Sequence, residues 1–138
     1  MIIEFDLDDK RFLDFLHKAT STQAEEAYKS AIDNIDARIM RGVKKLTPVG
    51  QYDVKSGKKG GTLRRNWSIK RAKTVTGGVQ GSVFDPVYYA IYVNYGHRLR
   101  NNKWWEGYHM LENTLDAIEP FAKEIFKRQV YKILKNND

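Results

Sequence analysis

The sequence contains no cysteine among its 138 residues, so disulfides and thiolate metal sites are both excluded. It also lacks any run approaching the roughly 20 apolar residues that a membrane-spanning helix requires. The first six residues, Met1 to Asp6, include two acidic side chains and lack the basic and apolar regions of a secretion signal. We therefore expect a protein that works inside the cell.

Histidine is scarce as well, and its three copies are scattered. No two of His17, His97 and His109 stand at the i, i+4 spacing that a helical metal site uses. We therefore expect no metal and no cofactor.

No motif of a known catalytic chemistry is complete. Residues 56–62 are glycine-rich like a phosphate-binding loop, but no lysine follows Gly61 and no apolar strand leads into the segment. No serine lies in a G-x-S-x-G pattern. We expect no catalytic residue and a role other than that of an enzyme.

One enzymatic alternative stays open. His97, together with Arg98 and either Arg64 or Arg65, could supply the base and the cationic clamp of a small metal-free ribonuclease. No partner acid is marked out by its spacing, so a basic nucleic-acid-binding protein is the broader form of this alternative.

The net charge of +7 is concentrated in the middle of the chain. Residues 1–37 carry a net charge of -5, residues 38–73 one of +11, and residues 74–138 one of +1. A local excess of this size favours a polyanion or an acidic protein surface as partner. Solubility alone could equally explain the loop residues Lys55, Lys58 and Lys59.

The first half of the chain predicts helices. A short strand is expected over residues 2–7, where apolar and acidic residues alternate, and Asp8 and Asp9 suit the start of a short helix. An apolar stripe then predicts a long helix over residues 22–46, with Thr22 and Glu25 as a capping box. Thr47 and Pro48 should end it.

The second half predicts a mixed structure. The glycine- and lysine-rich residues 49–61 should form a mobile basic loop, and Gly77 and Gly78 should join the two strands of a hairpin. The elements expected around and after the hairpin turn are strands over 66–76 and 79–84, a short helix over 87–95 capped by a left-handed Gly96, a polar loop over 98–108, and a long helix from about residue 109 that Pro120 should kink or divide.

These elements predict an α+β fold in one domain spanning residues 1–138. A small antiparallel sheet should pack against a long N-terminal helix and a long C-terminal helix. The composition, 41% hydrophobic and 30% charged, is that of a globular protein.

Aromatic side chains are more numerous than one short helix can bury. The rings concerned are those of Trp67, Tyr88, Tyr89, Tyr92 and Tyr95. Trp104 and Trp105 stand in a polar segment without apolar neighbours. Tyrosine and tryptophan dominate protein–protein contacts, so we expect a neighbouring protein chain as the partner and treat base stacking as the alternative.

Three motifs in order resemble the tail-completion, or head–tail joining, proteins of long-tailed bacteriophages. They are Leu-Thr-Pro-Val at 46–49, Gly-Thr-Leu-Arg-Arg-Asn-Trp at 61–67, and Tyr-Ala-Ile-Tyr-Val-Asn-Tyr-Gly-His at 89–97. The likeness extends over about residues 3 to 130. This chain departs in an expanded link between Thr47 and Thr62, in Asn94 where the family has an acidic residue, and in Trp104 and Trp105 before the last helix.

The resemblance implies a structural component of the phage neck, found in the virion and assembled in the host cytoplasm. Such proteins form a ring between the head-completion or connector proteins and the tail tube or tail terminator proteins, and DNA passes through the ring. On this reading, Lys58, Lys59, Arg64 and Arg65 would dock onto a partner or DNA. The contacts between subunits would come from Tyr92, Tyr95, Trp104 and Trp105.

Overall fold

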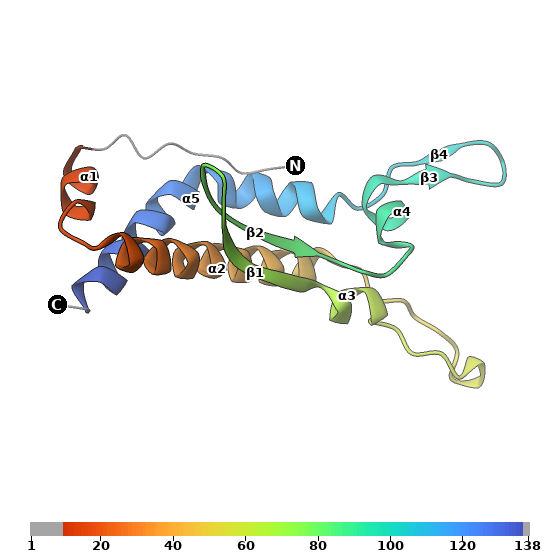
Figure 1. The fold of residues 1–138 in the computed structure, drawn as a ribbon. Helices are drawn as coiled ribbons and strands as arrows, with labels where there is room; N and C mark the ends of the chain where they lie inside the picture. The colour runs from red at the N-terminus through yellow and green to blue at the C-terminus, as the bar shows by residue number, and fades with distance from the viewer. Residues whose placement is uncertain (1–9, 137–138) are drawn as a thin grey trace.

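A computed structural model describes residues 10–136 of the chain. Its α+β architecture confirms the predicted fold class: two long helices lie side by side, and a small antiparallel hairpin packs against the first of them (Figure 1). The elements in chain order are α1 (Lys10–Leu16), α2 (Ser21–Leu46), the 3-10 turn η1 (Val54–Ser56), α3 (Thr62–Asn66), β1 (Ser68–Val75), β2 (Gly78–Phe84), α4 (Ala90–Tyr95), β3 (His97–Arg98), β4 (Trp104–Trp105) and α5 (Met110–Lys135). The strand expected over 2–7, and the helix-starting residues Asp8 and Asp9, lie outside the described residues.

Helix α2 matches the predicted long helix, but its cap is not the predicted one. Thr20, two residues before Thr22, accepts the backbone N–H of Gln23 at 3.1 Å, and the Gln23 side chain accepts the N–H of Thr20 at 3.0 Å. The prediction of Thr22 with Glu25 was therefore wrong. Glutamine serves in a capping box as well as glutamate does, and the helix consequently starts one residue earlier.

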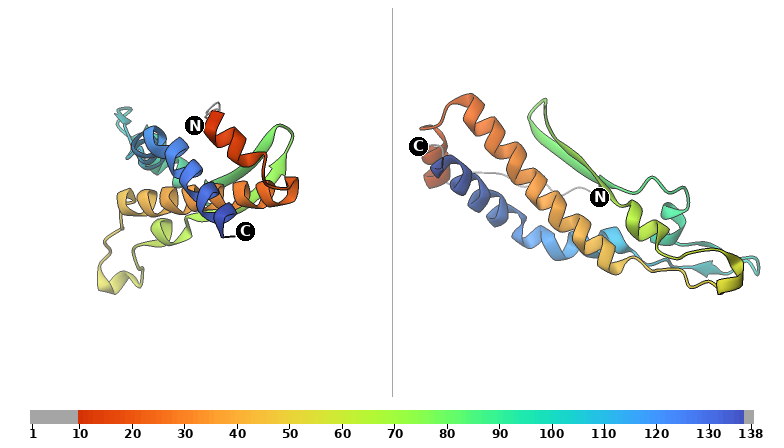
Figure 2. Two further views of the ribbon diagram at one scale, coloured as in Figure 1. Left: turned by 90° about the vertical axis from the view of Figure 1, so that its left-hand side faces the viewer. Right: turned by 90° about the horizontal axis from the view of Figure 1, so that it is seen from below.

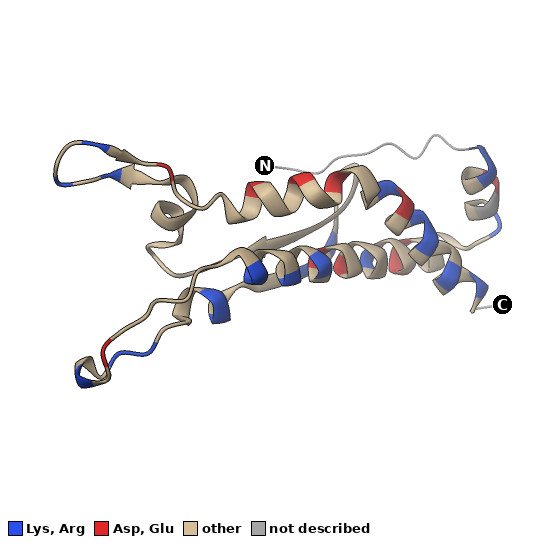
Figure 3. Ribbon diagram, turned by 180° about the vertical axis from the view of Figure 1, so that it is seen from behind, with Lys and Arg blue, Asp and Glu red and all other residues tan. Residues whose placement is uncertain are grey.

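Helix α5 is continuous, so the predicted division at Pro120 does not occur. Proline has no N–H to donate to the carbonyl one turn before it, and such a gap commonly bends a helix. The ribbon of α5 changes direction partway along its length (Figures 1 and 3).

The main core lies between α2 and α5 and beneath α1. Both long helices place an apolar stripe on the shared interface, and Phe12 of α1 makes edge-to-face contacts with Phe126 and Tyr131. Buried members of this core include Ala27, Ala31, Ile35, Ile39, Leu115, Phe126, Val130 and Leu134. A second cluster, Val43, Leu63, Trp67, Ala90 and Met110, lies nearer the other end and ties α3 and α4 to the helix pair.

The β1–β2 hairpin forms as predicted, but its two-residue turn is Thr76–Gly77 instead of Gly77–Gly78, because Gly78 already pairs with Val75 as the first residue of β2. Helix α2 supports the hairpin with acidic side chains. Pairing runs from Ser68 opposite Phe84 to Val75 opposite Gly78, with a bulge between Lys70 and Lys73. Within that bulge the N–H of Ala72 finds its acceptor on α2, because it donates to Asp33 Oδ1 at 2.7 Å. The helix thereby satisfies the backbone group that the bulge removes from strand pairing.

Both predicted loops contain further structure: η1 lies within the basic loop, and β3 pairs with β4 in the segment of the polar loop. The five-residue helix α3 lies between the basic loop and the hairpin, where no helix was predicted. The short helix α4 confirms the predicted helix. Gly96 follows it with a positive φ of 87°, but its ψ of 178° lies outside the left-handed helical region, so the predicted left-handed cap does not form. Among residues 10–136, no helix is long and apolar enough to cross a membrane.

Two extensions project from the same end of the helix pair (Figures 1 and 2). We call residues 49–61 the basic prong and residues 97–105 the hairpin prong. The terminus of α5 and helix α1 lie at the opposite end. The prongs and the surface between them contain most of the residues that the sequence marked for function.

Candidate assembly surface

Thr47 joins the end of α2 to the segment that follows the basic prong. Its buried hydroxyl donates to the Val43 carbonyl at 2.5 Å and accepts the indole N–H of Trp67 at 2.8 Å. Its carbonyl accepts two bonds from the Arg64 guanidinium, from Nε at 3.1 Å and from Nη2 at 2.6 Å. The first two sequence motifs are therefore bonded to each other in space.

The basic prong is closed at its base and exposed along its length. Gly50 and Gly60 approach so closely that a Cβ on Gly60 would collide with the Gly50 carbonyl oxygen. Arg65 Nη1 donates to the Gly60 carbonyl at 3.0 Å, and residues 51–59 are all exposed. The prong therefore stands clear of the helix pair from a fixed base.

The four predicted docking residues fall into two groups. Lys58 and Lys59 lie on the exposed prong, and Lys58 Nζ is 5.8 Å from the centre of the Tyr52 ring. Arg64 and Arg65 are also exposed, but both guanidiniums bond backbone carbonyls at the prong base. The side chains of the two lysines make no such bond to a backbone carbonyl, so direct contact with a partner remains the prediction for them.

Asn94 links α4 to the start of α5. Its Oδ1 accepts the N–H of Leu111 at 3.1 Å, while its Nδ2 donates to both carboxylate oxygens of Glu112 at 3.0 and 2.9 Å. Leu111 and Glu112 are the second and third residues of α5, whose own N-cap, His109, makes no side-chain cap bond. Asn94 thus caps the start of α5 from outside the helix, a role that the sequence did not reveal.

The predicted subunit-contact residues are largely exposed aromatics around α4 and the hairpin prong. The exposed fraction is 54% for Tyr92, 48% for Tyr95 and 56% for Trp104. Trp105 is partly buried, with its ring 5.3 Å from His97 and 5.4 Å from Tyr108. Trp67, by contrast, is a core residue.

Sequence reasoning gave less weight to two neighbours of this surface. Tyr88 is 85% exposed and Ile91 is 65% exposed, the first just before α4 and the second within it. Apolar exposure on this scale within one short segment is typical of a surface that meets another protein.

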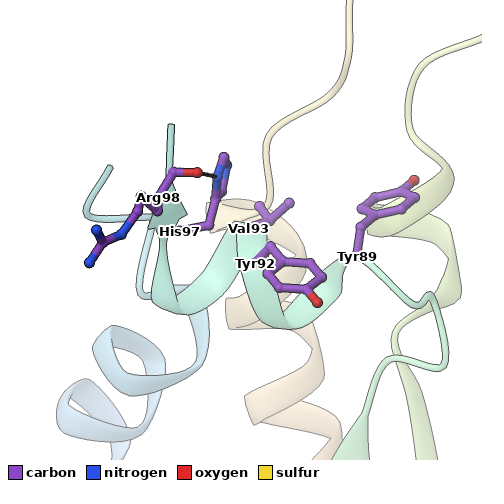
Figure 4. Close-up of a pocket in the computed structure, with 5 residues that line it drawn as sticks. All are labelled: Tyr89, Tyr92, Val93, His97 and Arg98. Atoms are coloured by element: carbon purple, nitrogen blue, oxygen red, sulfur yellow. Dashed lines mark hydrogen bonds between the residues drawn. The ribbon is translucent and has the colours of Figure 1, made fainter. Parts of the chain in front are cut away.

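An open hollow of about 590 Å³ lies beside α4 (Figure 4). It is lined by Tyr89, Tyr92, Val93, His97 and Arg98. His97 Nδ1 is 3.2 Å from the Arg98 carbonyl, which can only accept, so this nitrogen carries the proton in that bond. Three rings, one aliphatic side chain and one cation line the hollow, with no carboxylate among the lining residues.

Close backbone contact holds the hairpin prong to the end of α4. A Cβ on Gly96 would collide with the Trp105 carbonyl oxygen, and one on Gly107 would lie 2.5 Å from the Gly96 nitrogen. Both glycines have positive φ. Only glycine gives the hairpin prong this approach to α4, which fixes His97 and Arg98 at the edge of the hollow.

Few ionisable groups have unusual environments. Burial, and then the charge of Glu112, raise the pKa of Tyr95. Burial, and then the charge of Asp33, raise the pKa of Asp36 to about 6. Asp36 lies beneath β2 and far along the chain from the aromatic surface. Among the described residues, no group of histidines and carboxylates could hold a metal ion.

The structure brings together only part of the site that the ribonuclease alternative requires. His97 and Arg98 lie together at the hollow, whereas Arg64 and Arg65 are not among the residues that line it. The hollow therefore offers one possible base and one cation.

Comparison with known proteins gives one family match. The model of the family described as "Bacteriophage HK97-gp10, putative tail-component" matches residues 10–96, which is more than half of the chain and runs from α1 to the glycine after α4. No curated protein and no solved structure matches the chain.

Proposed function

This chain belongs to the HK97-gp10-like family of bacteriophage tail components, and we propose that within the virion it is the neck protein that joins the DNA-filled head to the tail. On this proposal residues 1–138 form one joining domain, and copies of the chain form a ring. The partners are head-completion or connector proteins on one side and tail tube or tail terminator proteins on the other.

The observation that carries the proposal is the pair of prongs at one end of the helix pair. A joining protein must present one surface to its own copies and another to a different ring. The exposed aromatics Tyr92, Tyr95 and Trp104, with Trp105 beside them, suit the first kind of contact. The lysines of the basic prong suit an acidic surface or the DNA that passes through the ring.

Figure 3 shows Lys and Arg on both prongs and at the base of the basic prong. Lys58 and Lys59, on the basic prong, are fully available to a partner, while Arg64 and Arg65 hold the base from which the prong projects. We propose that all four contribute to docking, the lysines by direct contact and the arginines also by holding the prong in place.

Deleting the gene from the phage or prophage tests the proposal. Electron microscopy should show filled heads lying apart from finished tails, and supplying the wild-type chain should restore joined particles. Intact joined particles in the deletion strain would contradict the neck role.

A second candidate is a basic nucleic-acid-binding protein, with the small ribonuclease as its enzymatic form. The placement of His97 and Arg98 together at the hollow favours it. Binding to DNA or RNA that weakens steeply with salt, in the absence of phage partners, would support this candidate. Cleavage that His97→Ala abolishes would support the ribonuclease.

A further inference from the structure

We propose that the exposed side of α2 and β1 binds the phosphate backbone of a nucleic acid duplex, whatever the base sequence. We call this surface the basic face. Neither candidate function above uses its residues, which are exposed Arg38, Arg41 and Lys45 of α2 and exposed Lys70, Arg71 and Lys73 of β1.

Strand β1 lies beside the exposed side of α2, so the cations of the two elements border each other. The backbone of β1 bonds Asp33 of α2, whereas Gly81 of β2 lies so close to Asp36 that a Cβ on the glycine would collide with that carboxylate. At 3.6 residues per turn, Asp33 lies between Asp36 and the side of the helix that carries Arg41 and Lys45. The hairpin therefore places β1, and not β2, next to that side.

The cations of α2 form a row. Arg38, Arg41 and Lys45 stand at positions i, i+3 and i+7, so they share one side of the helix over about 10 Å. That length corresponds to about three base-pair steps of a duplex, at roughly 3.4 Å for each step. Figure 3 shows Lys and Arg recurring along this half of α2 and again on α3 and the basic prong.

No acidic side chain neutralises the basic face. Residues 38–73 contain a single acidic residue, Asp53, which lies on the basic prong. Within residues 10–136, none of the lysines and arginines of this segment takes part in an ion pair. Arg38 donates to the neutral Asn34 side chain, and Lys70 Nζ is 5.6 Å from the centre of the Phe84 ring. An excess of positive charge without counter-charge attracts a polyanion.

A second copy of this chain is a poor source of the missing negative charge. Many acidic side chains of residues 10–136 are ion-paired, hydrogen-bonded or buried in their own copy. They include Glu25, Glu26, Asp33, Asp36, Glu112 and Glu124. The negative charge that meets the basic face should therefore come from another kind of molecule.

The composition of the basic face favours phosphate over an acidic protein. The centre of a protein–protein contact is depleted in charged residues and enriched in aromatic ones, whereas this face presents a row of cations. Arginine and lysine are the side chains that contact phosphate oxygens, and such contacts carry no sequence information.

The same composition favours a duplex over a single strand. Proteins that hold single strands stack bases on aromatic side chains. Neither β1 nor the part of α2 after Tyr28 contains an aromatic residue. The basic face therefore offers charge to a backbone and no platform for unpaired bases.

The test is direct binding by the purified full chain. The probe is a fluorescent DNA duplex of about 30 base pairs, and its anisotropy is measured over a series of salt concentrations. The test variant combines Arg41→Gln, Lys45→Gln and Lys73→Gln, whose side chains make no ion pair or side-chain hydrogen bond in the described part of the chain. The control combines Arg128→Gln, Lys132→Gln and Lys135→Gln, which remove the same charge from exposed positions near the end of α5.

We expect the wild type to bind two duplexes of unrelated sequence equally, and more tightly than a single strand of the same length. The test variant should bind the duplex at least about tenfold more weakly in about 0.1 M salt, because each lost phosphate contact also lowers the slope of log affinity against log salt by about 0.9. The control should bind like the wild type, and circular dichroism should show that both variants remain folded.

Three results would overturn the proposal. They are a wild type that does not bind the duplex, a test variant that binds it as well as the control does, and a single strand that binds as tightly as the duplex. Displacement of the duplex by polyglutamate as readily as by unlabelled duplex would also overturn it and would indicate an acidic protein as the partner.

Duplex binding through the basic face is compatible with both candidate functions, between which the deletion strain decides. Failure of the binding test would leave the neck role intact. Joined particles in the deletion strain would remove the neck role whether or not the duplex binds.

Discussion

At the scale of single residues, Thr47 connects the end of α2 to the segment that contains Arg64 and Trp67. One threonine ends α2, accepts the Trp67 indole N–H and receives the Arg64 guanidinium. Because its hydroxyl is buried, removing it leaves the indole N–H without an acceptor.

Thr47→Val should therefore destabilise the fold with almost no change in side-chain volume. We expect the free energy of unfolding to fall by about 1–3 kcal/mol, since a buried donor is left unsatisfied. Urea denaturation followed by tryptophan fluorescence would measure it. Thr22→Val, on the exposed face of α2, is the matched control; equal stability of the two variants would contradict the role given to the hydroxyl.

Asp36 should make the stability of the protein depend on pH in the opposite sense to a salt-bridged carboxylate. Only 6% of the residue is exposed, its Oδ2 has no hydrogen-bond partner in the described structure, and its pKa is raised to about 6. The native state therefore binds this proton more tightly than the unfolded chain does. The ionised carboxylate therefore lowers the free energy of unfolding. This destabilisation is absent below the ordinary carboxyl pKa and fully present above pH 6.

Asp36→Asn removes this titration. We expect the stability of the wild type relative to the variant to fall by on the order of 2–3 kcal/mol as the pH rises from 4 to 7. Denaturation curves at a series of pH values would measure the difference. For Asp116→Asn, at an exposed carboxylate on α5, the stability difference from the wild type should hardly change with pH. The same pH-independent difference for Asp36→Asn would contradict the destabilisation assigned to ionised Asp36.

At the scale of elements, Asn94 determines how α4 and α5 fit together. Asn94→Ala removes an acceptor for Leu111 and two donated bonds to Glu112; Asn94 is buried, and all three bonds are partly buried. We expect a loss of about 1–3 kcal/mol and faster hydrogen exchange at the first amides of α5. Asn113→Ala, at an exposed position in the same helix, is the control; unchanged exchange in Asn94→Ala would contradict the capping role.

The long elements could be predicted from the sequence because each carries its own signal. Apolar residues repeat along α2 and α5 with the helical period, and the two glycines indicated the β1–β2 turn to within one residue, since Gly77 lies in the turn and Gly78 begins β2. The elements that were missed have no such signal. α3 has five residues and β3 has two, and contacts with distant residues hold them, including the bonds from Arg64 to Thr47.

The composition of the sequence indicated which kinds of residue form the candidate site, but it did not indicate how those residues are arranged in space. The exposed rings of Tyr92 and Trp104 follow from an excess of aromatics that the core could not hold. Charge alone could not separate Lys58, which is exposed on the prong, from Arg64, which bonds a carbonyl. Asn94 could not be identified either, because its partner Glu112 lies 18 residues further along the chain.

At the scale of the whole molecule, the proposed function assigns a different contact to each of the two prongs. Lys58→Glu with Lys59→Glu reverses the charge of the basic prong without touching its base, so the fold should keep its stability while joined particles become rare. Counting joined particles by electron microscopy would measure the effect. Lys132→Glu with Lys135→Glu, at the opposite end of the molecule, is the control, and normal joining with the prong variant would remove the docking role of these lysines.

The closed base of the basic prong also bears on how this protein can change over evolution. Because Thr47, Arg64 and the paired glycines Gly50 and Gly60 fix the two ends of the prong, the residues between them do not support the body. The entropy of closing a loop rises slowly with its length, by only about 0.6 kcal/mol for each doubling. Insertions and deletions within residues 51–59 should therefore be tolerated, so the reach of the prong could be adjusted to a new partner while the body stays the same.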